Sequence, residues 1–375
     1  MKDLKPKIIL LFVVLISCSH NRIQIKPIDA EQSTWYWGGN NGRTGFSDAD
    51  VQPSLQPAWN FSATSVLDKA ITASGSYLFF GTQDGMVYIL DVQSGKNIRS
   101  FDIQQNSGVT CAPDGNQLII VKRAGKPSLT AVDFVNRDTI WKIDVGPIAG
   151  EVLIGDKNII AVNEKGVVVA VSRSNGNLVW KRKLDLPVYS TPALSGKTVV
   201  ISADNGMLYA LSIDTGEIFW EKTLPEHIVS NPVIQNNKIF IGSREGMFFC
   251  ISKTDGNILW QFKCDGGVYY AASASSDHVV FGTSRGIIYC LDANQGKEEW
   301  HLNTDSVIGT TPLITENWIY FGTLDKMIYG VERNTGKVGW CYKTKGRVKT
   351  SPIIWKQMLV VASEDRFVYG FEQIR

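Results

Sequence analysis

The chain has 375 residues, of which 44% are hydrophobic and 20% charged, a balance that supplies a large apolar core and excludes a disordered chain. Its 38 lysine and arginine residues nearly match its 36 aspartate and glutamate residues. We therefore expect no nucleic-acid partner, since such partners select strongly basic surfaces.

The segment 1–17 has the features of a cleaved export signal. Lys2, Lys5 and Lys7 precede a short apolar run over 8–16. That run is too short to remain in a bilayer as a mature spanning helix. The segment 15–18 reads Leu-Ile-Ser-Cys and matches the lipobox of bacterial lipoprotein precursors, which implies that Cys18 becomes the lipid-modified first residue.

Residues 18–34 are then expected to form a tether between the lipid and a folded domain. Ser19 stands where an inner-membrane retention signal would place aspartate. We therefore expect the protein at the periplasmic face of the outer membrane, held there through Cys18.

A tryptophan recurs at a nearly constant interval in the rest of the chain, at Trp141, Trp180, Trp220, Trp260, Trp300 and Trp340. Each copy contains apolar runs of strand length separated by Asn-Gly, Asp-Gly or Thr-Gly turns, in which glycine adopts the positive φ that tight hairpins need. Four short antiparallel strands in a repeat of about 40 residues are typical of a propeller blade. The sequence predicts an all-β fold, an eight-bladed β-propeller over residues 35–375.

The last of the eight copies stops short of its own tryptophan strand. Trp59 stands one full repeat before Arg99, which occupies the tryptophan position of the first copy. We expect the strand around Trp59 to complete the last blade, because a ring closed in this way leaves no long unpaired edge.

A small residue stands ten positions before each of these tryptophans. The residues are Ala131, Ala170, Ala210, Cys250, Cys290 and Gly330, with Gly370 in the blade that Trp59 would complete. In the first copy both positions change together, because Ile89 replaces the small residue and Arg99 the tryptophan. This compensation of volume indicates structural docking of the indoles in a packed interior, not stacking on a ligand.

The repeat resembles the tryptophan-docking repeat of pyrroloquinoline-quinone-like (PQQ-like) propellers. The segment Asp214-Thr215-Gly216 matches the turn of that family, and the opening 35–45 is similar to the segment that often precedes such propellers. Some relatives are quinone-dependent dehydrogenases with an adjacent Cys-Cys pair, a bound calcium ion and an acidic base. This sequence has no Cys-Cys pair and no two histidines at ligand spacing, so we expect no cofactor, no metal and no catalytic residues.

The remaining chemistry-bearing side chains have structural explanations. Acidic residues recur in one hairpin turn, at Asp84, Asp204, Glu245 and Asp325, where we interpret them as solvated turn residues. Cys250 and Cys290 are interpreted as core residues, and the pairing of Cys264 with Cys341 is left open.

An exported lipoprotein with such a propeller resembles the BamB family of outer-membrane assembly factors. That resemblance implies a non-enzymatic scaffold that binds the β-barrel assembly machinery; the alternatives are another binding or sensing role in the envelope, or a quinoprotein dehydrogenase. Candidate partner contacts lie in the connections that follow the tryptophan strands, at Tyr189, Tyr269, Tyr270, Arg347 and Lys349. The alternative is that the tyrosines only pack around a central channel and the basic residues form a solvated edge.

Overall fold

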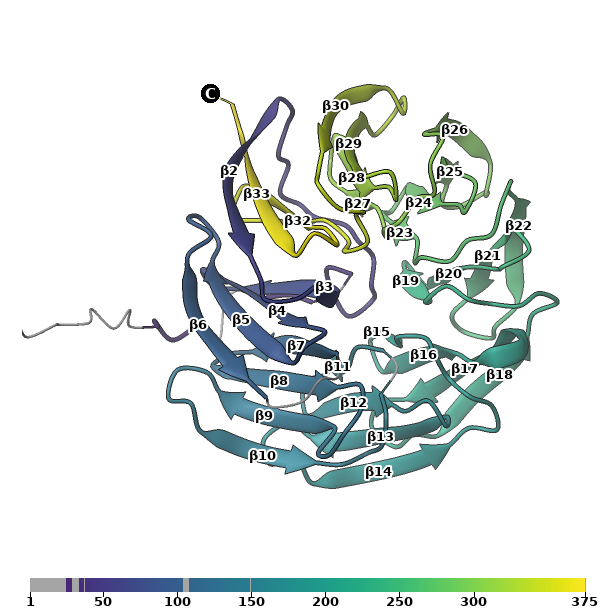
Figure 1. Ribbon diagram of the computed structural model, residues 1–375. Coiled ribbons are helices and arrows are strands. Elements are labelled where there is room, and N and C mark those ends of the chain that lie inside the picture. The colour runs from purple at the N-terminus through teal and green to yellow at the C-terminus, as the bar shows by residue number, and fades with distance from the viewer. Residues whose placement is uncertain (1–24, 29–33, 37, 104–107, 149, 375) are drawn as a thin grey trace, which may run out of the picture.

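The computed structural model of the chain describes residues 25–28, 34–36, 38–103, 108–148 and 150–374. Cys18 and the whole predicted export signal lie outside these residues, so the lipid-attachment site stays a prediction. In the described part, eight antiparallel sheets surround a central axis (Figure 1), which confirms the predicted eight-bladed β-propeller. One short 3-10 helix, η1 (Asp204–Gly206), lies in a hairpin turn of blade 4.

The first four blades follow one another along the chain, each with its innermost strand first. Blade 1 comprises β3 (Leu67–Ser74), β4 (Tyr77–Thr82), β5 (Met86–Asp91) and β6 (Asn97–Asp102), and β1 (Thr34–Trp35) adds a fifth strand to its inner edge. Blade 2 comprises β7 (Val109–Asp114), β8 (Gln117–Lys122), β9 (Leu129–Asp133) and β10 (Thr139–Ile143). Blade 3 comprises β11 (Leu153–Ile154), β12 (Asn158–Val162), β13 (Val167–Ser172) and β14 (Leu178–Lys183). Blade 4 comprises β15 (Ala193–Ser195), β16 (Thr198–Ser202), β17 (Met207–Ser212) and β18 (Ile218–Thr223).

The other four blades complete the ring. Blade 5 comprises β19 (Val233–Gln235), β20 (Lys238–Gly242), β21 (Met247–Ser252) and β22 (Ile258–Lys263). Blade 6 comprises β23 (Ser273–Ala274), β24 (His278–Gly282), β25 (Ile287–Asp292) and β26 (Glu298–Asn303). Blade 7 comprises β27 (Leu313–Ile314), β28 (Trp318–Gly322), β29 (Met327–Glu332) and β30 (Val338–Lys343). Blade 8 comprises β31 (Ile353–Trp355), β32 (Met358–Ala362), β33 (Phe367–Gln373) and the N-terminal β2 (Leu55–Ser62).

The hydrophobic core lies between neighbouring blades. The two middle strands of a blade are covered on both faces, so they are almost continuously apolar, as in β4, which is buried at every position. Between blades 5 and 6, the rings of Phe248 and Phe281 stack with centroids 3.9 Å apart. The outermost strands are mostly exposed, as in β14.

Each docking residue lies directly opposite its small partner in the adjacent strand. The cross-strand pairs are Trp59–Gly370, Trp141–Ala131, Trp180–Ala170, Trp220–Ala210, Trp260–Cys250, Trp300–Cys290 and Trp340–Gly330. The spacing of ten positions in the sequence therefore reflects one constant register of the two outer strands in these blades.

The indole also contacts the next blade, a contact that the sequence pattern did not indicate. Trp220 Nε1 donates a hydrogen bond to the main-chain oxygen of Lys253 at 2.8 Å. Its ring covers the turn glycine Gly256, where an added Cβ would lie 2.8 Å from the indole. Glycine is needed there both for its positive φ of 72° and for this close approach. Each docking tryptophan therefore joins its own blade to the next one, through a hydrogen bond and through packing of the ring.

The seam between blades 1 and 2 is joined by an arginine in place of a tryptophan. Arg99 pairs with Ile89 across the outer strands, as the sequence predicts. Its guanidinium donates hydrogen bonds to the main-chain oxygens of Phe134 and Val135 in blade 2. Arg137, at a φ of 75°, stands where other blades have the glycine under the indole. Three positions thus change together, because no flat ring occupies this seam.

The closing strand is where the sequence predicts it. β2 pairs with β33 in antiparallel register, with Trp59 opposite Gly370, so blade 8 takes strands from both ends of the chain. The five described cysteines are all free: Cys264 is buried and Cys341 exposed, so this possible pair does not form.

Part of the expected tether packs against the propeller. Ile25 and Ile28 are 6% and 5% exposed and join the apolar cluster between blades 1 and 2. The main-chain N–H of Lys26 donates to the hydroxyl of Tyr77 at 2.8 Å, and that of Ile28 donates to Asn116 Oδ1 at 2.7 Å. The segment 25–28 therefore packs across the seam between blades 1 and 2, the seam that lacks a docking tryptophan.

Candidate functional site

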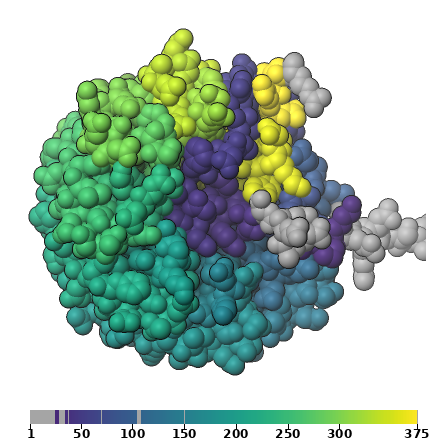
Figure 2. Space-filling view, turned by 180° about the vertical axis from the view of Figure 1, so that it is seen from behind, coloured from purple at the N-terminus to yellow at the C-terminus, as the bar shows by residue number. Residues whose placement is uncertain are grey.

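A segment that precedes the first blade crosses the centre of the ring. Main-chain oxygens of this segment accept hydrogen bonds from the innermost strands of four successive blades: Asn41 from Leu194, Gly42 from Ile234, Thr44 from Ala274 and Gly45 from Ile314. Figure 2 shows this early part of the chain in the middle of one face of the disc. We call residues 41–45 the central plug.

Arg43 anchors the central plug from within. Its side chain is 1% exposed, and its guanidinium donates to the main-chain oxygens of Val152 and Pro192 at 3.0 and 3.3 Å. Burial lowers the pKa of Arg43 to about 10, and the nearby carboxylate of Glu151 opposes that shift. The charge is tolerated because the carbonyl groups and a buried anion surround it.

A cavity of about 470 Å³ lies above the central plug. The residues of its inner wall come three positions before the residues that contact the central plug. Thr191 precedes Leu194 in blade 4, and Asn231 precedes Ile234 in blade 5. Neighbouring blades are linked in this wall, since the N–H of Thr191 donates to Asn231 Oδ1 at 2.7 Å. The cavity wall and the contacts of the central plug therefore follow one another along the same blades.

The outer rim of the cavity follows the repeat. Five rim residues stand nine positions after a docking tryptophan, namely Asp68, Tyr189, Val229, Tyr269 and Lys349. The connections place equivalent residues at equivalent points around the axis, so these five positions bring side chains of four different types to the same opening. Function can vary here without any change in the framework.

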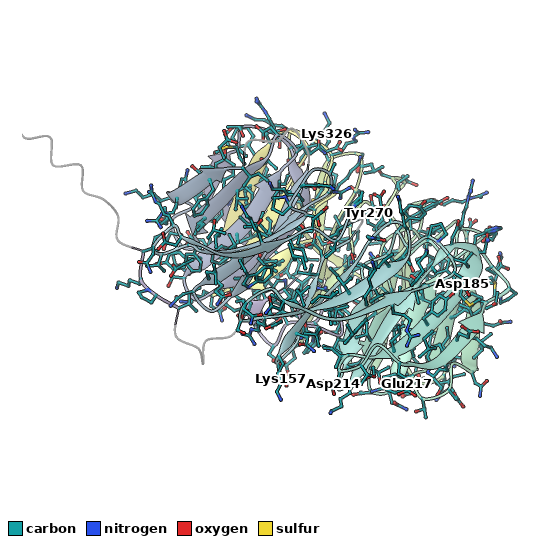
Figure 3. The ribbon with its side chains drawn as sticks, turned by 90° about the horizontal axis from the view of Figure 1, so that it is seen from below. Lys157, Asp185, Asp214, Glu217, Tyr270 and Lys326 are labelled. Atoms are coloured by element: carbon teal, nitrogen blue, oxygen red, sulfur yellow. The ribbon has the colours of Figure 1, made fainter. Side chains whose placement is uncertain are left out.

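One half of this rim is apolar and exposed. Tyr189, Val229 and Tyr269, from three consecutive connections, have exposed fractions of 64%, 40% and 48%. Tyr270 lies next to them in the cavity wall, and in Figure 3 it lies on the opposite side of the molecule from Lys157 and Asp214. Burial raises the pKa of Tyr270, and the nearby Glu364 adds to the shift.

The other half of the rim is charged. Arg123 Nε lies 2.7 Å from Asp68 Oδ2, and Lys349 Nζ lies 2.7 Å from Glu364 Oε1. Arg347 forms a second ion pair with Glu364. Burial alone would raise the pKa of Glu364, but hydrogen bonds from Lys349 and Arg347 outweigh it and lower the pKa below its usual range.

Four of the five residues predicted as partner contacts line this cavity: Tyr189, Tyr269, Tyr270 and Lys349. Arg347 reaches it through its ion pair with Glu364. The sequence pattern did not point to the charged lining residues Asp68, Arg123, Glu151 and Glu364. Asp68 could have been found from its position nine places after Trp59, whereas Arg123 belongs to a hairpin turn that the repeat does not mark.

The chain matches one known protein family over most of its length. A PQQ-repeat family model described as outer membrane protein assembly factor BamB matches residues 49–190, 125–228, 164–307 and 284–374, which together span most of the sequence. The chain belongs to this BamB family. No curated protein sequence matches it significantly.

Solved structures of assembly factors and enzymes share the BamB-family fold. BamB from Moraxella catarrhalis aligns over 85% of this chain and 99% of its own, with a TM-score of 0.71 and 18% identity. A europium-containing methanol dehydrogenase aligns over 93% and 99%, with a TM-score of 0.75 and 13% identity. Quinohemoprotein alcohol dehydrogenase from Comamonas testosteroni aligns over 91% and 81%, with a TM-score of 0.77 and 12% identity. At these identities the likeness shows the fold alone.

One group of potential metal ligands occurs among the described residues of this BamB-family chain: His278, Cys290 and Glu299. Arg333 Nε donates to His278 Nδ1 at 3.0 Å, which leaves the ring proton on Nε2, 2.6 Å from Glu299 Oε2. A protonated ring nitrogen has no lone pair for a metal. The group therefore lies within blade 6, and the hydrogen bond from Arg333 to His278 links it to blade 7. In the part of the chain described, no helix has the length and apolar character to cross a membrane.

Proposed function

We propose that this protein is a lipid-anchored, non-enzymatic scaffold that serves as a BamB-like accessory factor in the assembly of outer-membrane β-barrel proteins. Lipidation of Cys18 would hold it at the periplasmic face of the outer membrane. The family match supports the assembly role, and the lipobox at residues 15–18 supports the anchor.

The observation that carries the proposal is the exposed apolar half of the cavity rim. Tyrosine side chains supply a large contact area at little cost in conformational entropy, and they are enriched among interface anchors. Tyr189 and Tyr269 are 64% and 48% exposed on short connections of a rigid ring. Burial of both rings by a partner would therefore require little rearrangement of the propeller.

Affinity purification from detergent-solubilised membranes tests the proposal. The full chain is compared with the double variant Tyr189→Ser and Tyr269→Ser, and with Phe219→Ser as a matched control. Phe219 is 53% exposed and lies on β18, an outermost strand away from the cavity. We expect the chain and the control to recover β-barrel assembly proteins, and the double variant to recover far less at an unchanged melting temperature.

Equal recovery by all three proteins would contradict a partner site at this rim. Recovery of a redox partner, or quinone absorbance in the purified chain, would instead support a dehydrogenase of the same fold.

A further inference from the structure

The two halves of the cavity rim have complementary chemistry. The apolar half consists of Tyr189, Val229 and Tyr269, which lead into the innermost strands of blades 4, 5 and 6. The charged half comes from blades 1, 2 and 8 on the other side of the same opening. A ligand that spans the opening therefore meets an apolar wall on one side and charges on the other.

The charged half carries a surplus of positive charge. The three cations Arg123, Arg347 and Lys349 face the two carboxylates of Asp68 and Glu364. The third lining carboxylate, Glu151, is offset by the buried Arg43 of the central plug, so one positive unit remains. Glu364 is shared by Arg347 and Lys349, whose side chains remain 54% and 40% exposed. These two cations can accept a second carboxylate without giving up Glu364.

The inner wall of the cavity offers hydrogen bonds suited to a peptide backbone. Asn231 accepts the Thr191 N–H through its Oδ1, and its Nδ2 has no hydrogen-bond partner within the described part of the chain. Thr311 lines the same inner wall. A volume of about 470 Å³ lies in the range of pockets that enclose small ligands.

We propose that the cavity receives a peptide segment of the partner in which an acidic residue adjoins an aromatic or large apolar residue. The carboxylate meets Lys349 and Arg347, and the apolar side chain packs among Tyr189, Val229 and Tyr269. This inference rests on the proposed protein-binding function of the same face. A neutral saccharide would also stack on tyrosine, but it would leave the surplus cation unmatched, so the charge favours the peptide.

Calorimetric titration of the purified chain with blocked hexapeptides tests this inference. The probe has an adjacent aspartate and phenylalanine in a glycine–serine background. Three control peptides each carry one substitution: asparagine or lysine in place of aspartate, or alanine in place of phenylalanine. We expect binding of the aspartate–phenylalanine peptide at about 1 mM or below, and weakening of at least about tenfold when asparagine replaces aspartate.

Variants of the chain locate the contact. Lys349→Gln should weaken the aspartate peptide and leave the asparagine peptide unchanged, whereas Tyr269→Ser should weaken both. The matched control is Lys197→Gln, because Lys197 forms an exposed ion pair with Asp214 at 2.8 Å, and Asp214 lies on the opposite face. Added salt should weaken only the aspartate peptide.

Equal affinity for the aspartate and asparagine peptides, or no heat with any peptide at about 1 mM, would overturn the inference. Binding of cellobiose in place of the peptides would overturn it in favour of a saccharide site. The proposed scaffold function would survive either result if the Tyr189→Ser and Tyr269→Ser variant still lost its partner in the purification.

Discussion

The indole Nε1 of Trp340 donates a hydrogen bond to the main-chain oxygen of Leu55, 3.0 Å away, although 285 positions separate the two residues. The other docking tryptophans make the same contact with a residue only 32 or 33 positions later. The difference arises because blade 8 takes its outermost strand from β2. That strand closes the ring on both sides, since Trp59 Nε1 in turn donates to Val92 in blade 1 at 3.0 Å.

Loss of the closing indole should cost more stability than loss of an interior one. Trp59 is 8% exposed and lies against Gly370 and Gly95, whereas Trp180 is only half-buried. We expect Trp59→Ala to lower the free energy of unfolding by about 3–5 kcal/mol, and Trp180→Ala by less. Chemical denaturation measures both, and an equal loss would contradict the special role of the closing strand.

The substituted seam predicts strong coupling between three residues. Arg99→Trp alone should destabilise the chain, because Ile89 and Arg137 occupy the space that an indole needs. The triple variant with Ile89→Ala and Arg137→Gly recreates the pattern of the other blades and should recover most of the loss. Thermal unfolding of the single and triple variants checks this, and additive effects would show that the three positions are independent.

The repeat explains why most of the fold can be predicted from sequence and much of the site cannot. The period and the small residue ten positions before each tryptophan report the register of the outer strands, so they locate the blades and the closing strand. Arg43 occurs in a segment with no counterpart in the repeats, and its role depends on carbonyl groups 109 and 149 positions away. The ion pair of Arg123 with Asp68 joins two different blades, so no local pattern shows it.

The contacts of residues 25–28 with blades 1 and 2 predict that this segment contributes to stability. Ile25 and Ile28 bury their side chains against the seam fastened by Arg99. We expect the double variant Ile25→Asp and Ile28→Asp to lower the free energy of unfolding by about 3 kcal/mol or more, the transfer cost of two large apolar side chains. Lys26→Asp provides the control, because that residue is exposed. An unchanged unfolding midpoint would show that the segment is not held in solution.

Acid should remove the stabilisation that Glu364 provides. Because the folded pKa of Glu364 lies below its ordinary value of 4.5, its ion pairs stabilise the chain above that pH. The stabilisation is lost as the pH falls through the folded pKa. We expect Glu364→Gln to be less stable than the parent chain at neutral pH, with the difference shrinking below pH 4.5. A difference that is independent of pH would contradict the ion-pair role.

Cys18 should determine membrane attachment. We expect Cys18→Ala to abolish incorporation of a radiolabelled fatty acid and to release the exported propeller into the soluble periplasmic fraction. The propeller itself should unfold at the same temperature, because its strands begin well after this residue. Labelled protein from the Cys18→Ala variant would contradict the lipobox interpretation.

Site-specific photo-crosslinking in living cells tests the scaffold function most directly. A photoreactive residue is placed at Tyr189 or Tyr269 on the cavity rim, and at Phe219 on outermost strand β18 as the control. The proposed function predicts crosslinks from the two rim positions to a component of the β-barrel assembly machinery, and none from Phe219. Crosslinks to that machinery from Phe219 alone, or from none of the three positions, would contradict it.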